Sequence, residues 1–191
     1  MQRGATLVLA IAAVMTGGAA AEAADRIDAT LRVDLEWAVD TGDGDTQELA
    51  LTFQPEVEVD LPAGMALTAI GRLRADAVDA LEPGAPTEHE VSAWSRRATL
   101  GTRVEAELRE LYLDARLGFL GGAWLRLGKQ QVVWGEADGL KVLDVVNPQH
   151  CRDFSLTTFE VSRIPLWTAN LEIPVGAATL QLLLIPDPTH H

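Results

Sequence analysis

The sequence has few basic residues, one cysteine and no long apolar run. Its 15 Lys and Arg are outnumbered by 28 Asp and Glu, which gives a formal net charge of −13. Nucleic acid is therefore not an expected partner, because its binding depends on clustered cations that contact phosphates. With Cys151 as the only cysteine, no internal disulfide can form. No stretch of about 20 uninterrupted apolar residues occurs, so no transmembrane helix is predicted.

Recognisable catalytic and metal-binding motifs are also missing. The sequence holds no Ser-His-Asp arrangement, no nucleophile elbow and no carboxylate pair in a context suited to acid–base chemistry. Gly42–Asp45 hints at calcium but lacks the remaining ligands of a known calcium loop. The histidines show no metal-ligand spacing; they are His89, His150, His190 and His191. We therefore expect neither an enzyme nor a metal or cofactor site.

Residues 1–23 have the pattern of a secretory signal peptide. Arg3 supplies a positive charge, Ala5–Met15 forms a short apolar core, and Ala21–Ala23 is a small-x-small cleavage site. The alternative, a retained anchor helix, requires a longer apolar core than this. We expect the mature domain to span residues 24–191.

Two stretches with period-two alternation follow, from Ile27 to Asp40 and from Glu48 to Leu61. In each, apolar residues alternate with mostly charged or polar ones, and the turn formers of Thr41–Asp45 lie between them. Successive side chains of a strand point to opposite faces, so the pattern predicts a β-hairpin with one apolar and one charged face. We expect Leu31, Val33, Leu35, Leu51 and Val57 on the apolar face, and Arg32, Asp34, Glu56 and Glu58 on the other.

Five further strands complete an all-β, antiparallel up-and-down meander of about seven strands. They are expected at about Met65–Ala77, Val104–Leu117, Ala123–Gln131, Ile164–Val175 and Ala178–Ile185. Short turns and long connections alternate strictly between the strands. This alternation is typical of outer-membrane barrels, which have short periplasmic turns and long external loops. A soluble sandwich also has one apolar face, but that face points inward.

Two segments carry a resemblance to a known family. They are Glu110–Leu117 and Leu125–Gly139, the second containing Gly-Lys-Gln before Trp-Gly; Asp144–Pro148 and Arg163–Trp167 add to it. The chain resembles proteobacterial outer-membrane porin-like β-barrels of uncharacterised function, similar in style to alginate-export and phosphate-selective porins. The resemblance implies a transmembrane β-barrel in the outer membrane of a Gram-negative bacterium.

The same resemblance implies a longer protein. Barrels of this kind end in a strand with a terminal aromatic residue, whereas this sequence ends in His191 after two prolines. Single-chain bacterial barrels also have an even number of strands, from eight upward. We therefore expect residues 24–191 to form the N-terminal part of a larger barrel.

The resemblance implies that the third external segment, Val132–Arg163, forms a pore constriction, as the third loop of general porins does by folding into the lumen. The residues expected to line it are Trp134, Glu136, Asp138, Lys141, Asp144, Asn147 and Arg152. A basic wall is expected opposite, formed by Arg72, Arg74, Arg116 and Arg126. Such charged linings select ions and solutes. The simpler interpretation is that these charges pair with each other on a polar face.

The expected function is passive passage of small polar or anionic solutes through a porin-like barrel. The alternatives are a non-conducting structural barrel of the outer membrane and a secreted soluble β-sandwich that binds a ligand. Expected partners are outer-membrane lipid and the solutes, and assembly into a homo-oligomer is compatible with this class of barrel.

Overall fold

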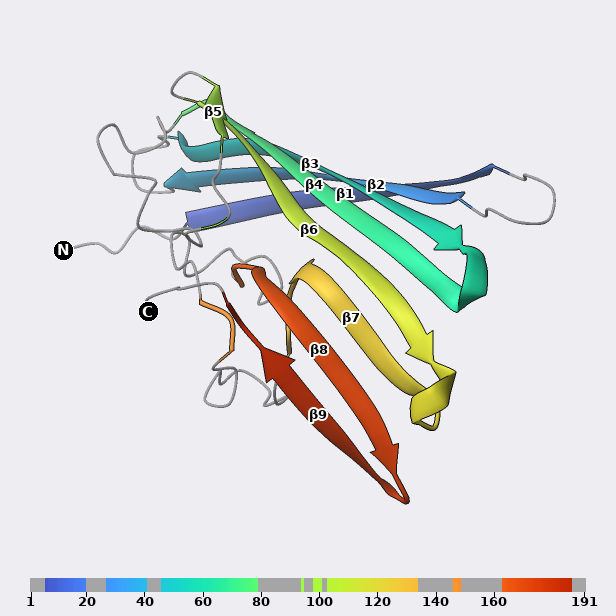
Figure 1. Cartoon of the computed structure of the whole chain (residues 1–191). Coiled ribbons are helices and arrows are strands. Elements are labelled where there is room, and N and C mark those ends of the chain that lie inside the picture. Colours follow the sequence, from blue (N-terminus) through green and yellow to red (C-terminus); the bar gives the residue numbers. More distant parts are fainter. Residues whose placement is uncertain are drawn as a thin grey trace.

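The structure, a computed structural model, describes residues 6–19, 27–40, 46–78, 94, 98–100, 103–133, 146–148 and 163–186. The described strands form one antiparallel sheet (Figure 1). In chain order, the seven expected strands are β2 (Ile27–Asp40), β3 (Thr46–Leu61), β4 (Met65–Asp76), β6 (Val104–Leu117), β7 (Ala123–Gln130), β8 (Leu166–Val175) and β9 (Ala178–Leu184).

Each of these strands pairs with its neighbours in chain order, so the predicted all-β antiparallel meander is confirmed. Two strands were not expected. Thr6–Ala19 forms β1, which pairs with β2, and Ala98–Leu100 forms the short β5, which pairs with β6. If the predicted signal peptide is removed, β1 leaves with it and β2 becomes the edge strand of the mature sheet.

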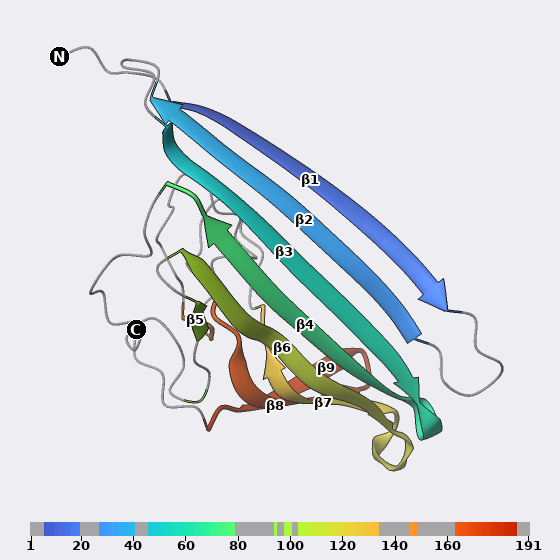
Figure 2. The same cartoon turned by 90° about the horizontal axis from the view of Figure 1, so that it is seen from above.

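The sheet curls into an open arc, so that β7, β8 and β9 turn away from the layer of β1 to β4 (Figures 1 and 2). No pairing in the described part joins β1 to β9, and the sheet is therefore not closed. Three short turns lie at one end of the strands (Figure 1): the 3-10 turn η1 (Pro62–Gly64), the segment 118–122 with η3 (Gly118–Leu120), and Gly176–Ala177.

The two faces of the sheet differ in chemistry, as the alternation predicts. Register places the apolar residues of neighbouring strands side by side: Leu35 lies opposite Leu51, and Val59 lies opposite Leu67. The polar and charged residues form matching rows on the other face, for example Thr52 opposite Arg74. We call these the apolar face and the polar face.

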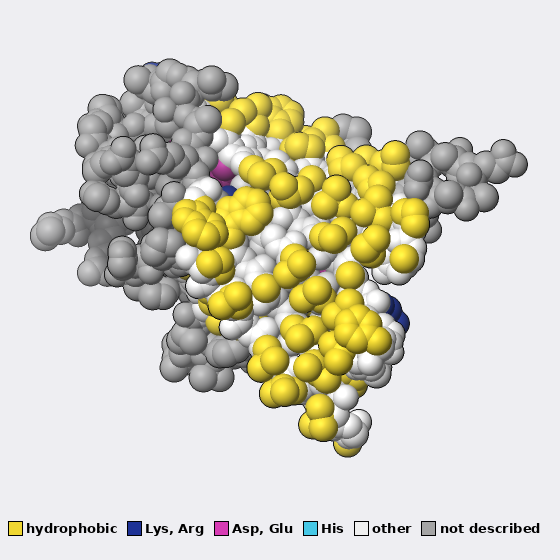
Figure 3. Space-filling model, in the orientation of Figure 1, with side chains coloured by type: hydrophobic (Ala, Val, Ile, Leu, Met, Phe, Trp, Pro, Cys, Tyr) yellow, Lys and Arg dark blue, Asp and Glu magenta, His cyan; other side chains and the backbone are white. Residues whose placement is uncertain are grey.

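Burial is the reverse of that in a soluble sandwich. The apolar face is open, with Leu73 38%, Leu127 42% and Leu182 48% exposed, and hydrophobic side chains cover the face seen in Figure 3. None of the five apolar residues expected to face outward is buried. The buried side chains are largely polar, and they include Thr52, Thr68, Arg74, Asp76, Arg109, Gln130, Thr168 and Asn170.

Candidate solute-binding site on the polar face

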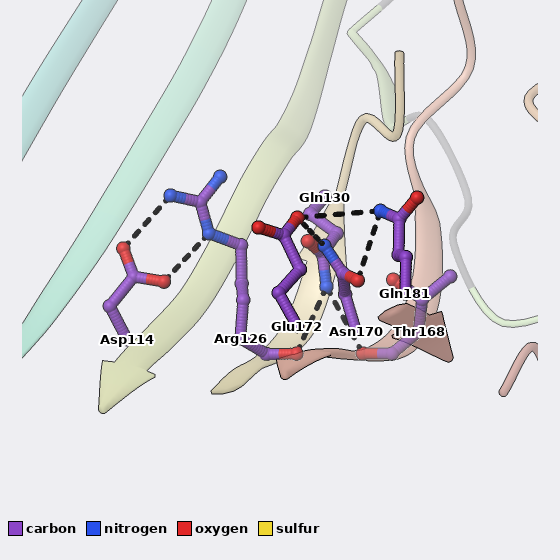
Figure 4. Close-up of polar contacts among 7 residues, drawn as sticks. All are labelled: Asp114, Arg126, Gln130, Thr168, Asn170, Glu172 and Gln181. Carbon is purple, nitrogen blue, oxygen red and sulfur yellow. Dashed lines mark hydrogen bonds and ion pairs between the residues drawn. The ribbon is translucent and has the colours of Figure 1, made fainter. Parts of the chain in front are cut away.

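Ion pairs and amide contacts line the polar face across β6 to β9 (Figure 4). Arg126 on β7 donates to both carboxylate oxygens of Asp114 on β6, at 2.7 and 2.9 Å. Its guanidinium also stacks on Tyr112 and Trp124, 4.0 and 4.5 Å from the ring centroids. A bidentate pair braced by two rings fixes the cation in one orientation.

The next part of this face is an amide network between β8 and β9 (Figure 4). Gln181 donates to the side-chain oxygens of Asn170 and Glu172, at 3.1 and 3.4 Å, and Asn170 donates to Glu172 at 3.4 Å. Side chains that satisfy each other in this way can be buried without leaving unpaired polar groups. This part of the face is therefore a pre-organised polar surface.

A β-bulge in β6 turns Arg109 towards the polar face. The register between β4 and β6 shifts at Ile70/Gly71, so that Ile70 pairs with Glu110 and Gly71 pairs with Leu108. Arg109 is the extra residue. A bulge of this kind re-aims a side chain. Arg109 is only 4% exposed; it forms an ion pair with Glu107 at 3.3 Å and donates to the Arg163 carbonyl at 3.0 Å.

Gly128 has an unusual backbone angle within β7, although the strand keeps its register with both neighbours there. Its φ is +135°, a region that L-residues rarely adopt, and a Cβ there would lie 2.2 Å from the Leu111 carbonyl oxygen. Only glycine fits such a close backbone approach. Beyond it, the amide of Gln130 reaches back to the carbonyl of Arg126 and across to that of Thr168, both at 3.3 Å. Gly128 therefore allows β6 and β7 to approach closely at Leu111.

Asn147 connects the two chain segments next to the site. It is 1% exposed. Its side-chain oxygen accepts from the Val132 amide and its NH₂ group donates to the Ile164 carbonyl, each at 2.8 Å. The Ile164 amide donates in turn to the Pro148 carbonyl at 2.8 Å. These bonds hold the segment after β7 against the segment before β8.

A cavity of about 320 Å³ opens on the polar face beside the bulge of β6, and neither the Arg126–Asp114 pair nor the amide network lines it. The cavity lies near the middle of the long strands. Arg32 on β2 is paired with Gln54 on β3, and Ile70 on β4 is paired with Glu110 on β6. Its size is at the lower end of the usual range for small-molecule sites. The lining residues are Arg32, Gln54, Ile70, Arg109, Glu110, Gln131, Val133 and Arg163.

The predicted constriction residues are represented in the described structure by one member. Asn147 is buried and both ends of its amide are engaged in the bonds given above. The other six lie outside the described residues: Trp134, Glu136, Asp138, Lys141, Asp144 and Arg152.

The four arginines expected to form a basic wall are not gathered at the cavity. Arg74 is buried beside Asp76, with 3.7 Å between Nη2 and the carboxylate, and Arg126 is bound to Asp114. Arg116 is exposed and Arg72 is half-buried. None of the four lines the cavity.

Sequence reasoning missed the combination of Arg32, Arg109 and Arg163. Arg32 was expected on the charged face, but nothing in the sequence linked it to Arg109 or Arg163. The available signal was the pair Arg109-Glu110, two consecutive charges that break the period of two and so indicate a bulge.

The described residues show neither a metal cluster nor a membrane-spanning helix. They contain no group of three or more His, Cys, Asp or Glu placed to hold a metal ion. No helix in this part of the chain is long and apolar enough to cross a membrane.

Comparison with known proteins assigns the chain to a family. The family described as "Protein of unknown function (DUF1302)" matches residues 83–183, more than half of the chain. The chain therefore belongs to this family. The match covers β6 with its bulge, β7, β8 and all but the last residue of β9. No curated protein and no solved structure matches the chain.

Proposed function

We propose that the chain is part of a porin-like barrel of the bacterial outer membrane that lets small polar or anionic solutes pass by diffusion. The observation that carries the proposal is the inverted burial of the sheet. Leu73, Leu127 and Leu182 are exposed on one face, while Thr68 and Arg109 are 3% and 4% exposed on the other. In water an exposed apolar face of this size is unfavourable, whereas in a bilayer it is the required arrangement.

Strand length and connectivity support the same proposal. Strands β2, β3 and β6 have 14, 16 and 14 residues, and about 9 to 11 tilted residues suffice to cross a bilayer. The three short turns lie at one end of the sheet, as the periplasmic turns of such barrels do. In this proposal β1 belongs to the export signal, and further strands close the wall beyond the open edges.

The polar face would line a water-filled pore, and its charges would select the solutes. Ion pairs such as Arg126–Asp114 keep the wall polar without a strong excess of one sign. A pore lined in this way admits hydrated solutes, and its charged groups favour some ions over others.

The test is made on the native gene product, purified from cell membranes in detergent and reconstituted into planar bilayers. We expect it to require detergent for extraction and to give discrete conductance steps. Insertion without conductance would favour a structural barrel. Recovery as a detergent-free periplasmic protein would contradict the membrane assignment and favour a soluble β-sandwich.

A further inference from the structure

The three short turns at one end of the sheet contain no charged residue. They are the segments 61–65, 117–123 and 174–178, and none of them holds Asp, Glu, Lys, Arg, Asn or Ser. Turns in water ordinarily use Asp, Asn and Ser beside Gly and Pro. The connection between β2 and β3 follows that rule, since its sequence Thr41–Asp45 carries two aspartates. The connections at the two ends of the strands therefore differ in chemistry.

Apolar side chains at these turns are open to the surroundings. Phe119, in the 3-10 turn η3, is 82% exposed, the highest value among the exposed large hydrophobic residues of the described structure. Val175 at the end of β8 is 58% exposed. Hydrophobic side chains also cover the lower tip of the molecule, where β8 meets β9 (Figures 1 and 3). A ring with so few protein contacts adds little packing to the sheet. Its contacts are with the medium around the turn.

The backbone of η1 gives independent evidence that polar side chains are avoided at this end. Ala63 has a φ of +65°, in the left-handed region. Residues other than glycine are uncommon there, and Asn and Asp are the usual exceptions, because their short polar side chains bond locally. Alanine has no such bond to offset the strain. An apolar residue therefore occupies a position where a turn in water would favour a polar one.

The apolar face of the strands continues into the turns. Leu61 lies opposite Met65 where β3 meets β4, and Val175 lies two residues beyond Ile173, on the same face of β8. The charged residues that precede the three turns lie on the polar face instead; they are Asp60, Arg116 and Glu172. A medium that covers the apolar face therefore also meets the turns.

We propose that this end of the sheet contacts phospholipid, with the three turns set into the layer where headgroups meet acyl chains and Phe119 as the principal contact. The inference rests on the proposed function, because it requires the apolar face to lie in a bilayer. It extends the lipid contact past the strands to the turn tips. Apolar side chains gain burial at that boundary, and the turns offer no cation to attract anionic lipid. The contact should therefore be insensitive to lipid charge.

The experiment is depth-dependent fluorescence quenching at position 119. Phe119→Trp is made in a variant whose five native tryptophans are replaced by phenylalanine, and the protein is reconstituted into phosphatidylcholine vesicles. We expect lipid brominated near the headgroup end of the acyl chain to quench the fluorescence more strongly than lipid brominated near the chain terminus. Aqueous acrylamide should quench it little. The result should be the same when phosphatidylglycerol replaces part of the phosphatidylcholine.

Three results would overturn the proposal. Quenching by acrylamide with no effect of brominated lipid would place the turn in water. Protection from both quenchers would show that protein covers position 119, either a second copy of this chain or another partner. Lipid quenching that appears only with phosphatidylglycerol would show that the contact is electrostatic rather than apolar.

Asp60→Trp in the same background is the matched control. Asp60 is exposed and precedes η1, but it lies on the polar face. Acrylamide should therefore quench the fluorescence at position 60, and brominated lipid should not. Equal quenching by lipid at positions 60 and 119 would overturn the assignment of the contact to the apolar side.

Phe119→Asp in the otherwise unaltered protein tests the proposal even where the tryptophan-free background does not fold. Because Phe119 has few protein contacts, its replacement acts mainly through the surroundings of the turn. We expect a lower urea midpoint in vesicles for Phe119→Asp and a smaller shift for Phe119→Leu, which keeps an apolar side chain. A midpoint for Phe119→Asp equal to that of the parent would overturn the proposal.

The two proposals fail in different ways. Lipid quenching of Trp37 on the apolar face, without lipid quenching at position 119, would overturn the turn contact and leave the membrane barrel intact. Lipid quenching at position 119 in a protein that gives no conductance would overturn the porin proposal and leave the turn contact. The absence of lipid quenching at both positions would contradict the membrane assignment on which both proposals depend.

Discussion

The β2–β3 pair and the β6–β7 pair are built from similar alternating sequences but differ in backbone geometry. The first keeps one register from Ile27 opposite Val59 to Ala38 opposite Glu48. β6 and β7 also keep one register with each other, but β6 carries the bulge at Arg109 in its pairing with β4, and Gly128 in β7 has a φ of +135°. Both regions contribute to the cavity: Arg32 and Gln54 line it from β2 and β3, and the bulge adds two consecutive residues of β6, Arg109 and Glu110.

The difference shows how a two-faced sheet acquires a site. Strict alternation places each side chain at a fixed position on one face, so neighbouring charges pair along the strands, as Arg32 and Asp34 do. A bulge breaks the period and brings consecutive residues to one face. Arg109 and Glu110 both line the cavity for that reason. The following substitutions test the comparison.

Gly128→Ala should lower the unfolding free energy most, because Gly128 lies where the backbones of β6 and β7 approach too closely for a side chain. The new Cβ would meet the Leu111 carbonyl oxygen at 2.2 Å with φ at +135°. We expect a loss of at least about 3 kcal/mol in unfolding free energy, or no folded protein. The measurement is urea unfolding in lipid vesicles, followed by tryptophan fluorescence.

Gly118→Ala is the matched control for this substitution. A Cβ at Gly118 meets nothing within 4 Å, so the change should stay within about 0.5 kcal/mol of the parent. If both alanine variants were equally stable, the fold would not require a glycine at position 128.

Leu73→Arg tests the difference between the two faces. Leu73 lies well inside β4, on the apolar face, and is 38% exposed. An arginine facing the bilayer interior should destabilise the protein by about 2–4 kcal/mol in vesicles. Glu58→Arg places the same side chain on an exposed part of the polar face and should have little effect. If Leu73→Arg left the unfolding free energy in vesicles unchanged, the result would indicate that this face contacts water.

Asn147→Ala removes the connection between the segments that border the cavity. The substitution leaves the Val132 amide and the Ile164 carbonyl without their partner, at a cost of about 2–3 kcal/mol. The same unfolding measurement applies. Asn170→Ala is the comparison variant, since its partners Gln181 and Glu172 also bond to each other, and it should cost less. Equal losses would mean that Asn147 has no special structural role.

Asp114→Asn should have the smallest effect, because the pair with Arg126 is partly exposed. The two side chains are 19% and 24% exposed, and Arg126 keeps its contacts with Tyr112 and Trp124. We expect a loss of about 1 kcal/mol. A double-mutant cycle with Arg126→Gln isolates the pair energy, and a coupling near zero would show that ring stacking alone orients the arginine.

The sequence predicted the strands better than the cavity. Alternation is a local property, and it located β6 at Val104–Leu117 and the other six strands to within a few residues. The strand at Thr6–Ala19 was missed because its apolar residues have no period of two and fit an export signal. The short β5 is too brief to show a pattern.

The cavity depends on contacts between distant residues, which a local pattern does not encode. Arg109 meets the Arg163 carbonyl across 54 positions, and only the bulge register brings the two together. Asn147 was selected from the sequence as a pore-lining residue, but in the described structure its amide ties Val132 to Ile164. A polar residue on an expected loop therefore predicts a hydrogen-bonding partner. The sequence does not show whether that partner is a solute or the backbone.

The most direct test of the central claim measures which medium the apolar face contacts. Trp37 lies on that face and is 41% exposed; Trp124 lies on the polar face against Arg126. Two variants each keep one of these tryptophans and carry phenylalanine at the other four. In vesicles of brominated lipid, Trp37 fluorescence should be strongly quenched by the lipid and protected from aqueous iodide, while Trp124 fluorescence should be little affected by the lipid. Iodide quenching of Trp37 with no effect of brominated lipid would contradict the account.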